Sequence, residues 1–119
     1  MTITSDEIEP VHDRFWRAVA AYLARYKGQS RVHVESDLRG YLTWCRDRRL
    51  DPLAVERIHV ELFLRWMQEV RCLKPSTVSR RLSVVAGFYR TCVIDAVIPL
   101  SPVEHVRARG FRPSRPPWD

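Results

Sequence analysis

The chain has 119 residues and a mass of 14.0 kDa, a size typical of one domain. Hydrophobic residues make up 45% of it and charged residues 29%, which excludes an intrinsically disordered chain and allows a packed core. No apolar run reaches the roughly 18 residues of a membrane span, and the N-terminus lacks the order of a signal peptide. The sequence therefore predicts a cytoplasmic protein with no membrane partner.

The formal net charge is +6, and the excess lies toward the C-terminus. Residues 1–73 hold 12 basic and 11 acidic residues, a balance of +1, whereas residues 74–119 hold 8 and 3, a balance of +5. Only Lys27 and Lys74 are lysines, so 18 of the 20 basic residues are arginines. A concentrated basic region attracts polyanions such as nucleic acid.

The first ten residues are acidic and end at Pro10, so we interpret residues 1–10 as a mobile leader or a frayed lead-in to a helix. An amphipathic stripe then predicts a first helix that ends at Gly28, a residue that favours the left-handed conformation of helix ends. The stripe comprises Phe15, Ala18, Val19, Tyr22, Leu23 and Tyr26.

The second predicted helix begins near Ser30, a candidate N-cap, and is closed by the RDRRLDP segment. Its inward face comprises Val34, Leu38, Tyr41, Leu42 and Cys45. Its other face comprises Arg31, Glu35, Arg39, Thr43 and Arg46. Residues 50–58 are expected to be irregular or briefly helical, and a third helix is expected over about residues 59–72, with Val60, Phe63, Leu64, Met67 and Val70 inward.

The fourth predicted helix runs from Pro75 or Ser76 to about Ala96 and has two different sides. The core stripe comprises Val78, Leu82, Val85, Tyr89, Cys92, Val93 and Ala96. The opposite face comprises Ser76, Thr77, Arg80, Arg81, Ser83, Val84, Gly87, Phe88, Arg90 and Thr91. Val84 and Gly87 are unusual on a solvated face, because glycine costs about 1 kcal/mol against alanine within a helix. Either a ligand fits closely there, or Gly87 admits a neighbouring helix while Arg80 and Arg81 are merely solvated.

These elements predict an all-α fold, a compact bundle of four main helices with an irregular basic C-terminal tail. One domain is expected over residues 11–109, and the Arg- and Pro-rich residues 110–119 are interpreted as the start of a linker. No alternating strand pattern or internal repeat is evident.

The cysteines and histidines indicate no metal site and no cofactor. Cys45, Cys72 and Cys92 have no metal-ligand spacing and are interpreted as small core residues, and no two of the four histidines are spaced i, i+4. We also interpret Trp16, Trp44 and Trp66 as packing residues, since each accompanies an apolar stripe. No nucleophile, base and orienting group form a catalytic cluster.

Three segments in order resemble the N-terminal, SAM-like core-binding domain of tyrosine recombinases, the phage integrase family. SRVHVESDLRGYLTWC is similar to that family's second helix through Asp37, Leu38, Tyr41, Leu42 and Trp44, and VELFLRWM fits the third. LKPSTVSRRLSVVAGFYRTCVIDAVIPLSPVEHV resembles its last long helix and exit turn. Here the chain departs from the family pattern at Ser30, Val34 and Ser101, the last standing where the family usually has Asn.

The resemblance implies one half of a clamp around double-stranded DNA in DNA integration or recombination, with the protein nucleoid-associated when bound. Catalysis would belong to a separate C-terminal domain, whose arginine, histidine and tyrosine motifs are not found in this chain. Self-association in a recombination synapse is a further implied contact. We expect a fragment of a larger enzyme or a natural short protein of the same fold. The candidate DNA-binding residues are Arg31, Arg39, Thr43, Arg46, Lys74, Ser76, Thr77, Arg80 and Arg81.

Two alternatives stay open. One is a helical protein-interaction module whose basic face binds an acidic partner. The other is a small helical DNA-binding regulator, against which we expect no pair of helices joined by a turn of three or four residues. Replacing Arg80 and Arg81 together by alanine is expected to remove most DNA affinity and leave helicity intact.

Overall fold

A computed structural model describes the backbone of residues 5–106 and the side chains of residues 13–106. Within this part of the chain the protein is all-helical and has no strand, which confirms the predicted fold class. The main helices are α1 (Ser5–Leu23), α2 (Gly28–Asp47), α3 (Arg57–Arg65) and α4 (Pro75–Ile94). The shorter turns are the 3-10 turn η1 (Pro52–Ala54) and the π-helical turn η2 (Trp66–Val70). The predicted linker at residues 110–119 lies outside the described residues. None of the described helices is long and apolar enough to cross a membrane.

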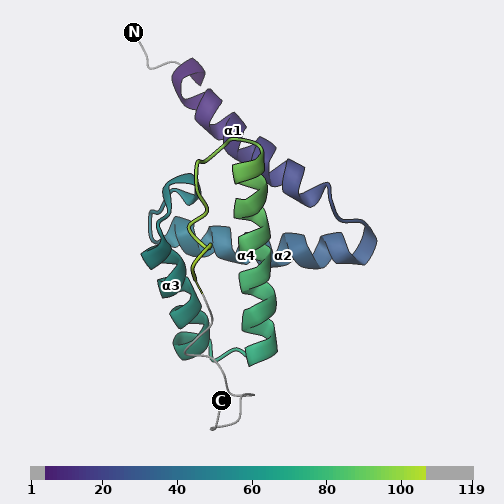
Figure 1. Ribbon diagram of the computed structural model, residues 1–119, viewed down its shortest axis with the longest axis vertical. Coiled ribbons are helices and arrows are strands. Elements are labelled where there is room, and N and C mark those ends of the chain that lie inside the picture. The colour runs from purple at the N-terminus through teal and green to yellow at the C-terminus, as the bar shows by residue number, and fades with distance from the viewer. Residues whose placement is uncertain (1–4, 107–119) are drawn as a thin grey trace.

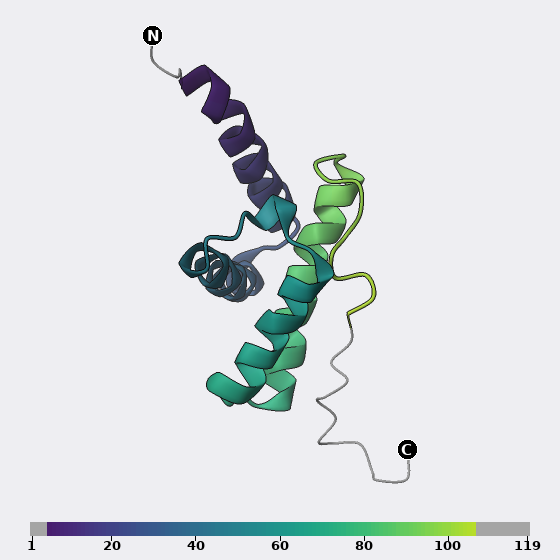
Figure 2. The same ribbon diagram turned by 90° about the vertical axis from the view of Figure 1, so that its left-hand side faces the viewer.

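Helix α4 is the central element (Figure 1). It packs against both α1 and α2, and α2 crosses it at a steep angle. Helix α3 continues directly into η2, and the chain then reverses, so that α3 and α4 run in opposite directions in both views (Figures 1 and 2). The two long helices α1 and α2 therefore both pack on α4, and α2 and α4 each carry four of the nine predicted DNA-binding residues.

The core is rich in aromatic side chains. Tyr22, Tyr41, Phe63, Phe88 and Tyr89 are almost completely buried, and their rings pack edge-on, for example with 4.9 Å between the ring centroids of Tyr41 and Phe63. Edge-to-face pairs of this kind add to the apolar burial because the positive ring edge meets the negative ring face. The predicted stripe of α4 is confirmed at Val78, Leu82, Val85, Tyr89 and Cys92.

The first helix is longer at its start and shorter at its end than expected. It begins at Ser5, so residues 5–10 have helical backbone, which agrees with the lead-in to a helix among the two expected alternatives, and it ends at Leu23. Gly28 does have a positive φ of 56°, but it is the first residue of α2. Ser30 consequently lies inside the first turn of α2, and Lys27 occupies the N-cap position that we assigned to Ser30.

Three helix ends use left-handed residues that are not glycine: Arg49, Cys72 and Ala96. After α2, the Leu50 N–H donates to the Cys45 carbonyl and the Arg49 N–H donates to the Arg46 carbonyl. These two hydrogen bonds are those of a Schellman motif at a helix C-terminus. Helix α2 therefore stops at Asp47, before Pro52 can act on it.

The third helical segment differs from the expectation at its C-terminal end. Val70 and Cys72, predicted to be inward, are both exposed, because η2 winds with a wider turn and displaces the helical stripe. Residues 52–54 are briefly helical, as predicted. Val93 near the end of α4 is half-buried and Ala96 beyond the helix is exposed, so the core stripe ends earlier than expected.

Residues 97–106 return along α4 and bury Ile98, Val103 and Val106. The Ser101 hydroxyl accepts a hydrogen bond from the Val103 N–H at 3.1 Å, a local side-chain bond that stabilises a turn. Arg14 of α1 donates to the Val97 carbonyl at 2.8 Å and ties this return segment to the first helix.

Candidate nucleic-acid interface

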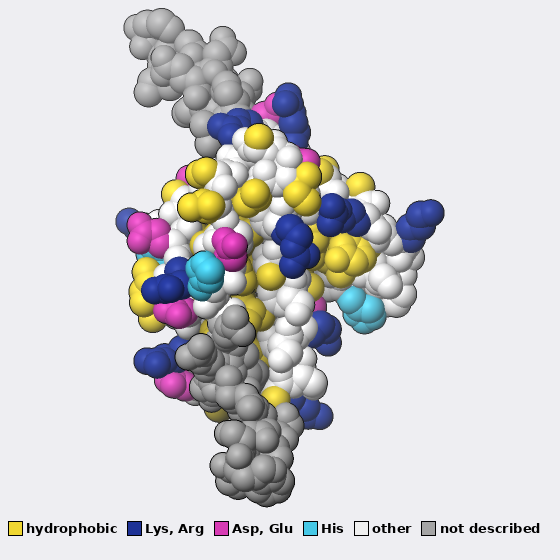
Figure 3. All heavy atoms as spheres, in the orientation of Figure 1, with side chains coloured by type: hydrophobic (Ala, Val, Ile, Leu, Met, Phe, Trp, Pro, Cys, Tyr) yellow, Lys and Arg dark blue, Asp and Glu magenta, His cyan; other side chains and the backbone are white. Residues whose placement is uncertain are grey.

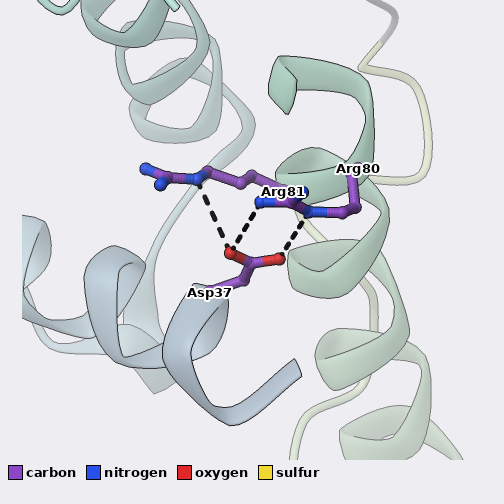
Figure 4. Close-up of polar contacts among 3 residues, drawn as sticks. All are labelled: Asp37, Arg80 and Arg81. Carbon is purple, nitrogen blue, oxygen red and sulfur yellow. Dashed lines mark hydrogen bonds and ion pairs between the residues drawn. The ribbon is translucent and has the colours of Figure 1, made fainter. Parts of the chain in front are cut away.

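Two of the predicted DNA-binding arginines converge on one buried carboxylate (Figure 4). Arg80 Nε and Nη2 donate to Asp37 Oδ2 and Oδ1 at 2.9 and 3.3 Å, and Arg81 Nε lies 3.6 Å from Asp37 Oδ1. The Asp37 side chain is 6% exposed, whereas those of Arg80 and Arg81 are 55% and 28% exposed. The acid comes from α2 and both bases from α4, so this group, the Asp37 triad, links the two helices.

The triad contradicts the alternative in which Arg80 and Arg81 are merely solvated, while their contact with DNA stays a prediction. A buried carboxylate without a partner is strongly unfavourable, so both arginines have a structural reason to be basic. Two guanidinium groups and one carboxylate still leave a formal charge of +1 on the triad. Because Arg80 remains more than half exposed, that charge is accessible from solvent.

The first turns of α4 present three further predicted residues. Lys74 and Ser76 are exposed and Thr77 is half-buried. Lys74 occupies the N-cap position with Pro75 after it, and among the described residues no side chain caps the first backbone amides of this helix. Free amides and the positive end of the helix dipole attract anions. This end of α4, with Lys74, Ser76, Thr77 and Arg80, is called the α4 entry below.

The predicted residues of α2 do not join the α4 entry. At 100° per residue, Arg39 and Arg46 lie about 160° and 180° around α2 from Asp37, which faces α4. Arg39 pairs with Glu35 at 2.9 Å and Arg46 with Asp47 at 3.6 Å. The nine predicted residues therefore do not form one continuous face.

Arg39, Thr43 and Arg46 instead line a largely apolar groove of about 1020 Å³. Its walls come from α1, α2 and η1, and its apolar lining includes Phe15, Trp16, Val19, Leu23, Leu38, Leu42, Leu50, Pro52 and Leu53. Arg31 lies in the first turn of α2 and is exposed. Within residues 13–106 its side chain makes no hydrogen bond or ion pair.

Four of the ten residues on the predicted polar face of α4 are buried. Val84, Gly87, Phe88 and Thr91 are all buried, which decides between the two readings of Gly87. A Cβ atom at position 87 would lie 2.8 Å from the Tyr22 hydroxyl oxygen, so glycine is needed for the approach of a neighbouring helix. The solvent-facing polar part of α4 is limited to its entry and to residues such as Ser79, Ser83 and Arg90.

The tryptophans divide between the core and the surface. Trp44 is buried and Trp66 is partly buried, as predicted for packing residues, and the Arg48 guanidinium carbon lies 4.5 Å from one ring centroid and 5.6 Å from the other. Trp16 is 56% exposed at the apolar groove, so its assignment to packing was wrong. Trp118 lies outside the described residues.

Charged side chains are interspersed on the α4 side of the molecule. Seen from this side, basic groups lie among acidic and apolar ones instead of gathering in one patch (Figure 3). Residues 107–119 contain four arginines and one aspartate, a balance of +3, so half of the net charge of +6 belongs to residues outside the described part.

The buried cysteine and tyrosine side chains of the core are unreactive near neutral pH. Burial raises the pKa of the Cys45 and Cys92 thiols to about 11, so neither is a nucleophile near neutral pH. Burial also raises the pKa of the Tyr41 hydroxyl, which lies 2.6 Å from the Tyr89 hydroxyl. In the part of the chain that the structure describes, no cluster of histidine, cysteine or acidic residues could hold a metal ion.

The connections between helices alter one argument against a DNA-binding regulator. Residues 24–27 and 71–74 are both four-residue connections between helical segments, so the expectation that no such turn exists was wrong. The second of them joins antiparallel helices, unlike the steeply angled pair of a helix-turn-helix. The connection between α1 and α2 has the length that such a unit requires.

No protein-family model matches this sequence, and no curated protein or solved structure is significantly similar to it.

Proposed function

We propose that this chain is a double-stranded DNA-binding domain of the core-binding type found in tyrosine recombinases, which holds one side of a duplex during DNA integration or recombination. In this proposal a separate catalytic domain supplies the chemistry and encloses the other side of the duplex. The sequence resemblance suggests the class of protein. The α4 entry is the observation that carries the DNA-binding proposal.

The α4 entry has the features that a phosphate backbone requires. Lys74 and Arg80 supply charge, Ser76 and Thr77 supply hydroxyl donors, and uncapped amides lie at the positive end of the helix. Phosphate contacts of this kind set the register of a protein on DNA and carry no sequence information. Binding by the chain alone is therefore expected to be weak, indifferent to sequence and steeply dependent on salt.

The first test is a titration of the full chain against a short labelled duplex at low and moderate salt, with Lys74→Ala and Arg90→Ala as a matched pair. Both are exposed basic residues, Lys74 at the N-cap of α4 and Arg90 within the helix, about 24 Å apart along its axis. Lys74→Ala is expected to weaken binding and to lower the slope of log affinity against log salt by about 1. Arg90→Ala is expected to change neither.

Two outcomes would contradict the proposal. If the chain does not bind the duplex at low salt, the proposed DNA-binding function is wrong. Equal losses in both variants would indicate attraction to the whole basic protein instead of contacts at the α4 entry. Circular dichroism of each variant provides the control for folding.

The apolar groove favours a second candidate, a protein-interaction module. An exposed tryptophan beside a largely apolar groove with arginines at its edge suits an amphipathic helix with acidic residues. An acidic amphipathic peptide included in the same titration tests this candidate. If the peptide binds, Trp16→Ala should abolish its binding and leave duplex affinity unchanged. A peptide that does not bind the wild-type chain, or that binds the variant equally well, counts against this candidate.

A further inference from the structure

The guanidinium group of Arg80 is held along one of its two donor edges. Its Nε and Nη2 atoms donate to the two oxygens of Asp37, while its side chain is 55% exposed. A guanidinium group is planar and has a second bidentate edge, formed by Nη1 and the remaining Nη2 hydrogen. Among the described residues Nη1 has no hydrogen-bond partner, so this second edge is unused by the protein.

From this arrangement we infer that Asp37 is a positioning residue for DNA binding: it fixes Arg80 so that the free edge of the guanidinium group is oriented for a phosphate. The inference rests on the proposed function of the α4 entry. Asp37 is 6% exposed and anchored on α2, so it can orient Arg80 without contacting the DNA itself.

Arg81 completes the arrangement by offsetting the charge of the acid. Its Nε lies 3.6 Å from Asp37 Oδ1, and its side chain is mostly buried. With one arginine alone, the carboxylate would cancel the positive charge that attracts a phosphate. With two, the triad keeps a formal charge of +1 while Arg80 stays oriented.

Orientation matters because a free arginine side chain has many rotamers. Binding to a phosphate normally restricts these rotamers and so reduces the affinity that the new hydrogen bonds provide. In the triad, Asp37 has already restricted them before DNA arrives. The ordering cost of one long side chain corresponds to a change of about threefold to tenfold in affinity.

If Asp37 had a competing role instead of a positioning role, the opposite change in DNA affinity would be expected. If Asp37 merely competed with phosphates for Arg80, Asp37→Asn would raise the charge of the protein by one and tighten binding, with a steeper salt dependence. If Asp37 positions Arg80, the same substitution should weaken binding by about threefold to tenfold despite the added charge. The sign of the change therefore distinguishes positioning from competition.

The experiment measures duplex affinity against salt for four full-length chains: wild type, Asp37→Asn, Arg80→Ala and the double variant. Asp37→Asn is expected to weaken binding when Arg80 is present. In the Arg80→Ala background it should no longer weaken binding, since there is nothing left to orient, and the added charge should tighten it slightly. A purely structural role of Asp37 would weaken binding in both backgrounds, and that result would overturn the inference.

Thermal unfolding of each chain checks that the variants fold. If Arg80→Ala fails to fold, Arg80→Lys replaces it, because lysine keeps the charge but lacks the second edge. Asp37→Asn binding that is unchanged or tighter overturns the positioning role and leaves the proposed function standing. Absence of salt-sensitive binding by the wild-type chain overturns both.

Discussion

The hydroxyl of Tyr89 forms two hydrogen bonds in the core, one with the Tyr41 hydroxyl and one with the Pro52 carbonyl. Its hydroxyl donates to the Pro52 carbonyl at 2.7 Å, so the Tyr41 hydroxyl, 2.6 Å away, must be the donor in the bond between the two tyrosines. The pair therefore connects α2, η1 and α4 through two consecutive hydrogen bonds. Such a chain is costly to break because the orphaned Tyr41 hydroxyl would stay buried.

The two tyrosines are expected to respond unequally to the loss of a hydroxyl. Tyr89→Phe removes both bonds and leaves the Tyr41 hydroxyl and the Pro52 carbonyl without partners, so it should lower the free energy of unfolding by about 2 to 4 kcal/mol. Tyr41→Phe removes one bond and should cost about 1 kcal/mol. Urea unfolding of both variants measures the difference, and equal costs would mean that Pro52 is not an important acceptor.

The Asp37 triad also affects the interpretation of the double variant in which Arg80 and Arg81 are replaced by alanine. Removal of both Arg80 and Arg81 leaves Asp37 buried and unpaired, so the double alanine variant is expected to be less stable as well as less able to bind DNA. A loss of affinity in that variant would not separate the two effects. Lys74→Ala avoids the problem because Lys74 lies outside the triad.

At the scale of the elements, the contact between α1 and α4 depends on Gly87. A methyl group there would meet the Tyr22 ring, with its hydroxyl oxygen and one ring carbon at 2.8 and 2.9 Å. Gly87→Ala should therefore lower the free energy of unfolding by about 1 to 3 kcal/mol through overpacking.

Gly40 provides the matched control for Gly87. It lies within α2, and a Cβ atom there would have nothing within 4 Å. Gly40→Ala should raise stability by about 0.5 to 1 kcal/mol, because alanine loses less backbone freedom on folding. Thermal or urea unfolding of the two variants should give shifts of opposite sign. A shift of the same sign in both would show that α1 and α4 are less closely packed.

The sequence predicted the helices well where apolar spacing and proline determine them. Helix α4 begins at Pro75 as expected and ends two residues before Ala96. The wrong predictions concern helix ends that no glycine, proline or capping residue in the sequence indicates. Arg49, Cys72 and Ala96 take the left-handed conformation that usually favours glycine, and the π-helical η2 turns Val70 outward. Tertiary packing stabilises these ends, so local spacing does not reveal them.

The sequence predicted which basic residues belong to the candidate site, but it did not predict which residue they pair with. Spacing identified Arg80 and Arg81 as basic residues near the start of a helix, but their partner Asp37 lies 43 residues before Arg80. Helical spacing also suggested one polar face on α2 and one on α4 without showing that they diverge. Such relations depend on how α2 crosses α4, which periodicity along either helix does not contain.

At the scale of the whole molecule, positive charge is shared between the α4 entry and residues 107–119, which hold four arginines. A chain that ends at Val106 keeps all the described contacts but loses those arginines. If they also approach phosphates, the shorter chain should bind duplex DNA more weakly, with a salt slope lower by as much as about 3 to 4. An unchanged slope would confine the phosphate contacts to residues before 107.

The cysteines of this chain supply a reporter for these measurements. Cys45 and Cys92 are buried, whereas Cys72 is exposed in the turn that leads to Lys74. A maleimide fluorophore should therefore attach to one position without any engineered substitution. That position adjoins the α4 entry, so the emission of the dye would register the arrival of a duplex there and would be insensitive to a peptide in the groove between α1 and α2.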